Sequence, residues 1–116
     1  MTLATDALDQ AQRLSSKAVT SLTHHHLGLL LSRRGQHRAA LPHFDAALRL
    51  RRNDWQRWAA AETLVARAKA LVGLGEICQA RNSYDDAVAI LEALNDPRAL
   101  DVRSEVAALD TLLDAS

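Results

Sequence analysis

The residues with the greatest potential for chemistry are three adjacent histidines, His24, His25 and His26. Zn²⁺ requires several such ligands to converge on one point. Consecutive residues of a helix point about 100° apart, so this triplet diverges if the segment is helical. A metal site would need His37 or His43 brought alongside by the fold. We expect helix-surface polarity and assign no metal ligand, and metal binding through the histidines stays an alternative.

The other reactive side chains are isolated. Cys78 has no Cys or His beside it, and we expect it to pack as a small apolar residue and not to act as a nucleophile. Asp85 and Asp86 are neighbours that point apart on a helix, which favours a solvated face. The sequence contains no nucleophile elbow, phosphate-binding glycine loop or CxxC pair. We therefore predict no catalytic residue, no cofactor and no enzymatic activity.

The composition predicts helices throughout and limits the partners. Of 116 residues, 48% are apolar and 3% aromatic, with four Gly and two Pro to break helices. The 14 basic residues equal the 14 acidic ones, so we expect no nucleic-acid partner. No segment approaches the roughly 20 apolar residues of a membrane span. A single cysteine and the absence of a signal peptide indicate a cytoplasmic protein without a membrane partner.

The sequence repeats itself at a fixed interval. Gly35 falls on Gly75 and Phe44 on Tyr84 when the chain is shifted against itself by one period. Apolar positions follow the same register: Leu31 with Leu71, Ala40 with Ala80, Ala47 with Ala87, and Leu50 with Ile90. A period of about 40 residues indicates a stack of supersecondary units.

Each unit is predicted to form two antiparallel helices. The first helix of unit one is expected to end at Gly35, which would form its C-cap. Its apolar residues follow one another at helical spacing and form a stripe: Val19, Leu22, Leu27, Leu30 and Leu31. The remaining predicted core residues are Ala40, Phe44, Ala47, Leu48, Ala61, Leu64, Ala68, Leu71, Val72, Ala80, Tyr84, Ala87, Val88 and Leu91. Small residues among them let the helices approach closely. Pro42 predicts a mild kink or a late helix start near Ala39.

We predict one domain over residues 1–116, with about six helices. An orphan helix at 3–14 precedes repeat one at 17–52 and repeat two at 54–94, and a capping helix covers 97–114. Asp96 is expected to cap that last helix and Pro97 to occupy its first position. Its predicted apolar face comprises Leu100, Val106, Leu109 and Leu113.

Two tryptophans lie one helical turn apart near the start of repeat two. We expect Trp55 and Trp58 to seal the junction between the repeats. The alternative is an exposed aromatic anchor, since Trp is favoured at the energetic centres of interfaces.

The pattern Leu27-Gly28, Leu31, Gly35, Ala40-x3-Phe44 and Ala47 resembles the tetratricopeptide repeat, and Ala68, Leu71, Gly75, Ala80-x3-Tyr84 and Ala87 repeat it. Departures include His24 and Leu64 at the family's Trp position. The unit is longer than the family's usual length of about 34 residues. It is similar to the longer units of bacterial transcription regulators and signalling ATPases. The resemblance implies an all-α, right-handed superhelix of antiparallel helix pairs.

In this family the first helices of successive pairs line a concave groove that holds a peptide or a partner helix. Carried over by position, the resemblance implies these partner-binding residues: Leu22, His25, His26, Leu29 and Arg33 from one helix, and Glu62, Val65 and Lys69 from the next. We therefore predict a non-catalytic scaffold for a protein or peptide partner.

Self-assembly is the alternative function. Two full units fall short of the roughly three that a stable stack needs. The orphan helix would leave an apolar edge, formed by Leu3, Leu8 and Leu14, that a second copy could cover in a homodimer.

Overall fold

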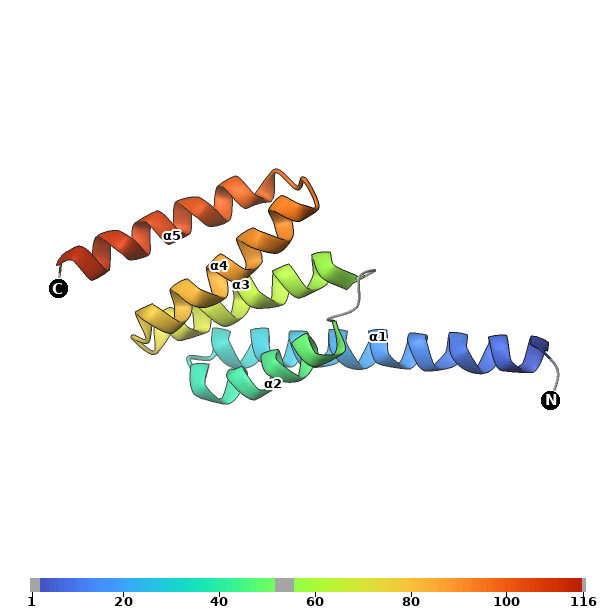
Figure 1. The fold of residues 1–116 in the computed structure, drawn as a ribbon. Coiled ribbons are helices and arrows are strands. Elements are labelled where there is room, and N and C mark those ends of the chain that lie inside the picture. The colour runs from blue at the N-terminus through green and yellow to red at the C-terminus, as the bar shows by residue number, and fades with distance from the viewer. Residues whose placement is uncertain (1–2, 52–55, 116) are drawn as a thin grey trace.

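The computed structural model describes residues 3–51 and 56–115, with backbone alone at 3–9, 11, 14 and 115. Five helices account for nearly all of this part of the chain: α1 (Leu3–Arg33), α2 (His37–Leu50), α3 (Arg57–Gly73), α4 (Ile77–Ala93) and α5 (Arg98–Ala115). Figure 1 shows their arrangement. The predicted all-α class is confirmed.

The helices pack in chain order. α1 packs on α2, α2 on α3, α3 on α4 and α4 on α5, while α1 and α3 touch over a smaller area. Short turns make α1 and α2 one antiparallel hairpin and α3 and α4 the next, with α5 against α4 (Figure 1). This is the predicted tetratricopeptide-like stack of helix pairs. Its right-handed sense stays a prediction.

The first helix is longer than the sequence analysis expected. Residues 3–14, expected to form a separate orphan helix, are continuous with the first helix of repeat one in α1. The described residues therefore form five helices where about six were expected. The physical reason is that Ser15, Ser16 and Lys17 at the expected break include no Gly or Pro, and Ser and Lys are tolerated inside a helix. The N-terminal half of α1 projects past the end of α2 (Figure 1).

One type of cap ends α1, α3 and α4. At the end of α1, the N–H of Gln36 donates to the carbonyl of Leu31 at 2.9 Å, and the N–H of Gly35 donates to the carbonyl of Ser32 at 3.0 Å. This Schellman pattern recurs around Gly75 and around Asn95. Each central residue is left-handed, with φ of +80° at Gly35, +78° at Gly75 and +56° at Asn95. The sequence period therefore corresponds to a repeated helix stop.

Two further predictions about helix ends had different outcomes. Asp96 does cap α5, because its Oδ1 accepts the N–H of Arg98 at 2.9 Å. The expected late start of the second helix was wrong. α2 begins at His37 and carries Pro42 inside it, since the preceding Schellman turn already ends at Gln36.

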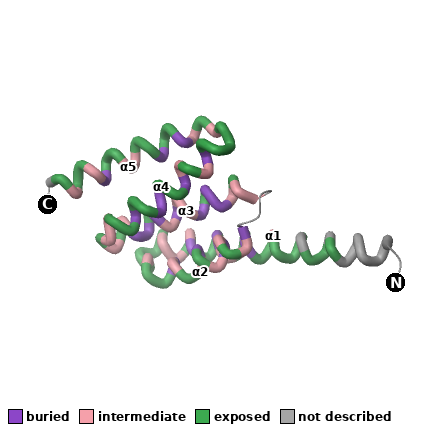
Figure 2. The backbone as a smooth tube through the Cα atoms, in the orientation of Figure 1, coloured by how far each residue is buried: buried purple, intermediate pink, exposed green. Residues whose placement is uncertain are grey.

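Most of the predicted core positions of α2, α3 and α4 are buried, and the others are half-buried: Leu48, Leu64, Val72 and Val88. Phe44 and Ala40 are fully buried and form one cluster with Ala66 and Ala70, while Leu71, Ala80 and Tyr84 belong to a larger cluster that extends to α5. Figure 2 shows this burial concentrated where the helices face one another. In α5 the buried residues are Ala99, Val102 and Leu109, whereas Leu100, predicted to face inward, is 67% exposed.

Most of the predicted apolar stripe of α1 lies on the solvent side of that helix, and only Leu31 is half-buried and packs against the cluster around Phe44. Val19 is 61% exposed, Leu22 49% and Leu30 46%. The buried face instead carries Ser21 and His25, together with Gly28. An amphipathic pattern alone places the apolar stripe inward, and here the opposite, polar and small face packs against α2 and α3.

Gly28 explains why that face of α1 turns inward. A Cβ at this position would lie 2.5 Å from Cε1 of Phe44, whose side chain is fully buried. Only glycine lets the Phe44 ring pack directly against the backbone of α1. Repeat two has Ala68 and Tyr84 at the corresponding positions, so the close fit of the Gly28–Phe44 contact belongs to repeat one.

We expect Gly28→Ala to destabilise the protein. In an open helix this change is normally stabilising by about 1 kcal/mol, but overpacking against Phe44 should reverse the sign, with a net loss of about 1–2 kcal/mol. Chemical denaturation of the wild type, Gly28→Ala, Phe44→Leu and the double variant forms the test. The smaller leucine side chain should accommodate the new methyl group, so equal effects of Gly28→Ala in both backgrounds would contradict the contact.

Candidate functional site

A cleft between α3 and α5 is the first candidate binding site. It has a volume of about 130 Å³ and is lined by Trp58, Ala61, Glu62, Val65, Leu91, Arg98 and Val102. Trp58 is 47% exposed, and the guanidinium of Arg98 lies 4.9 Å from the centroid of its ring. This distance is within the range of a cation–π contact. The cleft thus combines apolar walls with a carboxylate and a guanidinium at its edge.

Arg98 is held in place at this cleft. Its Nε and Nη2 donate to the two carboxylate oxygens of Asp96 at 3.0 and 2.6 Å. The hydrogen bonds from Arg98 lower the pKa of Asp96 to about 2, and those same contacts raise the pKa of Arg98. The residue that caps α5 therefore also fixes the cation over the Trp58 ring.

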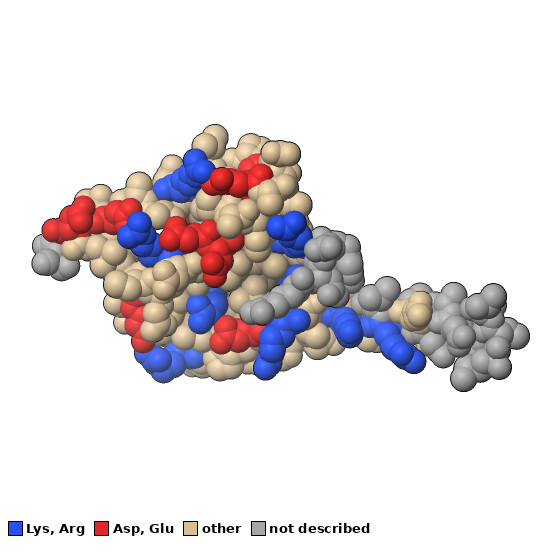
Figure 3. Space-filling model, in the orientation of Figure 1, with Lys and Arg blue, Asp and Glu red and all other residues tan. Residues whose placement is uncertain are grey.

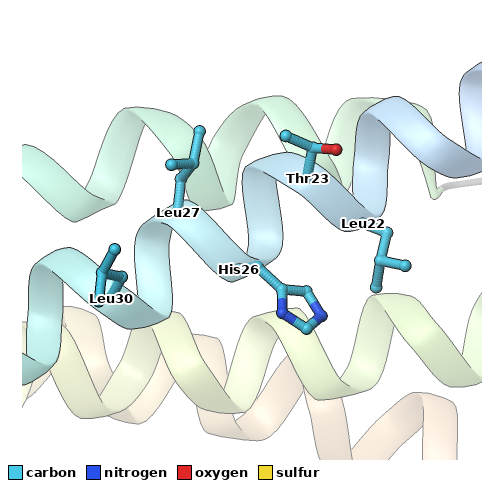
Figure 4. A pocket seen from close by; sticks show the side chains of 5 residues that line it. All are labelled: Leu22, Thr23, His26, Leu27 and Leu30. Atoms are coloured by element: carbon cyan, nitrogen blue, oxygen red, sulfur yellow. The ribbon is translucent and has the colours of Figure 1, made fainter.

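A second hollow lies on the uncovered side of α1. It has a volume of about 360 Å³ and is lined by Leu22, Thr23, His26, Leu27 and Leu30. In Figure 4 the Leu22 and His26 side chains point toward one edge of α1 and Leu27 toward the other, with Leu30 one turn further along the helix. The surface of this hollow is largely apolar, because only Thr23 and His26 contribute polar side-chain atoms.

The structure places four of the eight predicted partner-binding residues on these two surfaces. Leu22 and His26 line the hollow on α1, and Glu62 and Val65 line the cleft. Leu29 is half-buried and packs against the cluster around Phe44. Arg33 and Lys69 are exposed and line neither hollow. Sequence patterning missed Arg98 and Val102, because the family pattern that identified the other residues had faded by α5.

His25 has a different role from the predicted one. It is 8% exposed, and its Nδ1 lies 3.0 Å from Oγ1 of Thr63 in α3. Oγ1 of Thr63 also accepts a hydrogen bond from Nη1 of Arg51 at 2.7 Å, and Nε of Arg51 donates to Oγ of Ser21 at 3.4 Å. We therefore reassign His25 from the partner-binding surface to a buried polar cluster between the repeats, made of Ser21, His25, Arg51 and Thr63.

Burial shifts the protonation of this cluster. Desolvation, with the positive charges of Arg51 and His26 nearby, lowers the pKa of His25 to about 4. Desolvation also lowers the pKa of Arg51, opposed by the attraction of Glu62. His25 is therefore neutral in the folded protein at pH 7, and one of its ring nitrogens remains available to pair with Thr63.

The remaining histidines pair with other groups. Nδ1 of His24 lies 3.1 Å from Nδ1 of His43, and Nδ1 of His37 lies 2.8 Å from Oγ of Ser32. The triplet diverges as expected, since His25 is buried and His26 lines the hollow. Over residues 3–51 and 56–115, no group of three or more His, Cys, Asp or Glu is placed to hold a metal ion. The metal-binding alternative would therefore have to start from the two imidazoles of His24 and His43.

Other predictions about single residues had mixed outcomes. Cys78 is exposed, so its expected packing was wrong. Trp58 is a surface residue and does not seal the junction, while Trp55 lies outside the described residues. Asp85 and Asp86 lie on an exposed face as expected. The side chains of the predicted self-association residues, Leu3, Leu8 and Leu14, also lie outside the described residues.

Comparison with known proteins matched part of the chain to one protein family. Residues 23–57 match the model of the tetratricopeptide repeat family. The match spans the last third of α1, the capping turn at Gly35, all of α2 and the connection to α3. α3 and α4 repeat the same helix–turn–helix unit with a corresponding glycine cap at Gly75. No curated protein and no solved structure gave a significant match. In the described part of the chain, no helix is long and apolar enough to span a membrane.

We expect His25 to make folding stability depend on pH. Its pKa is lowered from 6.5 to about 4, so the unfolded chain takes up a proton between these values and the folded one does not. Stability is therefore fully present above pH 6.5 and falls toward pH 4, by at most about 3 kcal/mol from this group. Denaturant titrations over this range should show a shallower loss for His25→Gln. Parallel curves for the two proteins would contradict the assignment.

We expect no metal-dependent stabilisation by the histidines. Adding equimolar Zn²⁺ to protein dialysed against chelator should leave the melting temperature unchanged, because two imidazoles fall short of a complete protein-derived site. His24→Ala is the control. A melting temperature that rises for the wild type and stays constant for His24→Ala would establish the metal-binding alternative.

Proposed function

We propose that the chain is a non-catalytic protein-interaction module that binds a peptide or helix of its partner in the cleft between α3 and α5. Tetratricopeptide repeats generally mediate binding to protein partners, and residues 23–57 match this family. The position of the cleft agrees with the family's use of the first helices of each pair, because α3 and α5 hold corresponding places in the stack.

The observation that carries the proposal is the half-exposed Trp58 at this cleft. A large aromatic ring in contact with water gains from burial by a partner, and Trp is enriched at the energetic centres of interfaces. Arg98 holds one side of the ring at 4.9 Å, and Val65 and Val102 supply adjoining apolar surface. Glu62 and Arg98 provide opposite charges at the edge. A partner segment with an apolar or aromatic side chain flanked by polar groups fits this arrangement.

The other predicted groove residues extend the proposed surface. Lys69 lies further along α3, and Arg33 ends α1; both are exposed and provide charged positions beyond the cleft. We also propose that the chain belongs with the longer tetratricopeptide units resembling those of bacterial transcription regulators and signalling ATPases. The spacing of the caps at Gly35 and Gly75, which exceeds the usual repeat of about 34 residues, supports this. A cytoplasmic location, with no nucleic-acid or membrane partner, completes the proposal.

A displayed library of random peptides tests the proposed cleft. Peptides enriched on the wild-type protein should bind Trp58→Ala and Val65→Glu at least roughly tenfold more weakly, because these changes remove the anchor or place a charge on the apolar wall. Affinities measured by isothermal titration give the comparison, and circular dichroism checks that helicity is retained.

Gln79→Glu is the matched control, since Gln79 is exposed on α4 away from the cleft. It should bind the enriched peptides like the wild type. Enriched peptides that bind all four proteins equally would show that the cleft is not the binding site.

A further inference from the structure

The cleft between α3 and α5 has room for one side chain of a partner. Its volume of about 130 Å³ is well below the roughly 300 Å³ at which pockets for small-molecule ligands begin. The floor of the cleft is apolar and buried, since Ala61, Leu91 and Val102 are 1%, 4% and 6% exposed. Of the lining residues, Glu62 and Arg98 carry charge. These two side chains therefore decide which kind of partner residue can enter.

The charge of Arg98 is already neutralised. Its Nε and Nη2 donate to the two carboxylate oxygens of Asp96, at 3.0 and 2.6 Å. A carboxylate brought by a partner would have to share this cation with Asp96. It would also face the like charge of Glu62 in the same cleft, and like charges in contact oppose association. The cleft is therefore a poor site for an acidic side chain.

The carboxylate of Glu62 has no such partner. Figure 3 shows acidic and basic side chains close together over α4 and α5, where Arg81 pairs with Asp110 and Arg103 with Glu92. Glu62 is exposed on α3, and none of the ion pairs between described residues includes it. Of the two charges in the cleft, the negative one is thus the one open to a partner.

The other guanidinium that attracts Glu62 is buried. Arg51 is 4% exposed and donates to Oγ of Ser21, the carbonyl of Ala59 and Oγ1 of Thr63. It attracts Glu62 electrostatically, without forming an ion pair with it. Because hydrogen bonds to its own neighbours hold Arg51 between the repeats, the carboxylate oxygens of Glu62 remain open to a donor from a partner.

A basic side chain matches both parts of the cleft. Lysine and arginine carry an alkyl stem that lies along apolar surface while the charged head stays in water. Val65 and Val102 would cover the stem, and Glu62 at the rim would accept hydrogen bonds from the head. The Trp58 ring, which is 47% exposed, adds attraction for a cation.

We infer that the partner inserts one lysine or arginine into this cleft, with its stem on the apolar floor and its charge on Glu62. The inference rests on the proposed function and names the chemistry of the partner, a peptide or helix anchored by a basic residue. Lys69 is exposed two turns beyond Glu62 on the same face of α3, so it repels a second basic residue there. The partner segment should therefore carry an isolated basic residue and not a basic run.

Selections from a displayed library of random peptides test the inference. The library is selected separately on the wild type, Glu62→Gln and Glu62→Lys, each checked by circular dichroism for unchanged helicity. Asp86→Asn is the matched control, because Asp86 is an exposed carboxylate on α4 that does not line the cleft. Isothermal titration then measures the affinity of each enriched peptide for all four proteins. Glu62→Gln retains the test if Glu62→Lys fails to fold.

Peptides enriched on the wild type should share a lysine or arginine. Glu62→Gln should bind them about fivefold more weakly, the loss expected for one exposed ion pair, while Asp86→Asn should bind them like the wild type. High salt should weaken binding to the wild type and leave binding to Glu62→Gln nearly unchanged, because salt screens the ion pair. Peptides selected on Glu62→Lys should carry Asp or Glu in place of the basic residue.

The outcomes that would overturn this inference differ from those that contradict the proposed function. Enriched peptides that bind Trp58→Ala weakly but bind Glu62→Gln as tightly as the wild type would overturn the inference and leave the proposed function in place. A shared acidic residue would do the same and would assign recognition to Arg98. Binding that survives both Trp58→Ala and Val65→Glu would contradict the proposed function, and the inference with it.

Discussion

The arrangement of the two repeats depends on a guanidinium buried between them. Arg51 follows the last residue of α2 and is 4% exposed, yet it reaches the carbonyl of Ala59 at 3.2 Å and Oγ1 of Thr63 at 2.7 Å in α3. A buried charge is costly unless hydrogen bonds replace its water. Meeting this requirement ties the end of one helix pair to the start of the next. His25 and Ser21 join the same cluster from α1, so three helices are fixed by one set of polar contacts.

This constraint determines which face of α1 is buried. Because His25 and Ser21 reach Arg51 and Thr63, and because Gly28 admits the ring of Phe44, the polar and small face of α1 turns inward. The branched side chains on the opposite face of α1 are then exposed to solvent: Val19, Leu22, Leu27 and Leu30. A helix that is apolar on the outside therefore follows from polar contacts on the inside. The exposed hollow on α1 is a consequence of how the repeats are joined.

The stack also separates two surfaces of different character. The cleft between α3 and α5 contains Trp58 beneath a guanidinium that Asp96 holds in place. The solvent side of α1 instead carries the apolar side chains of Val19, Leu22, Leu27 and Leu30.

The sequence by itself determined the class of fold, the period and the helix stops. Gly35 and Gly75 mark left-handed positions that side chains disfavour, and the alanines and aromatic residues of α2 and α4 are buried where the repeat pattern predicts. These are local or strictly periodic properties, so they can be recognised without knowing the fold. The extent of the first helix was less well predicted, because the propensities of Ser15, Ser16 and Lys17 are a weak signal. The start of α2 was also less well predicted, because the turn at Gly35 fixes it at His37 despite the backbone hydrogen bond that Pro42 removes. Tertiary structure alone decided which way α1 faces and what its histidines do. An apolar stripe predicts an inward face only when no other contact competes, and here Phe44 selects the glycine face while Thr63 and Arg51 select His25.

Those partners lie on other helices, several turns or more away along the chain and beyond the reach of any local pattern. The same holds for Trp58, whose exposure depends on where α5 packs. The short-range pattern in the sequence thus specified the fold. Contacts between residues far apart in the chain determined which side chains are exposed at the candidate binding surfaces.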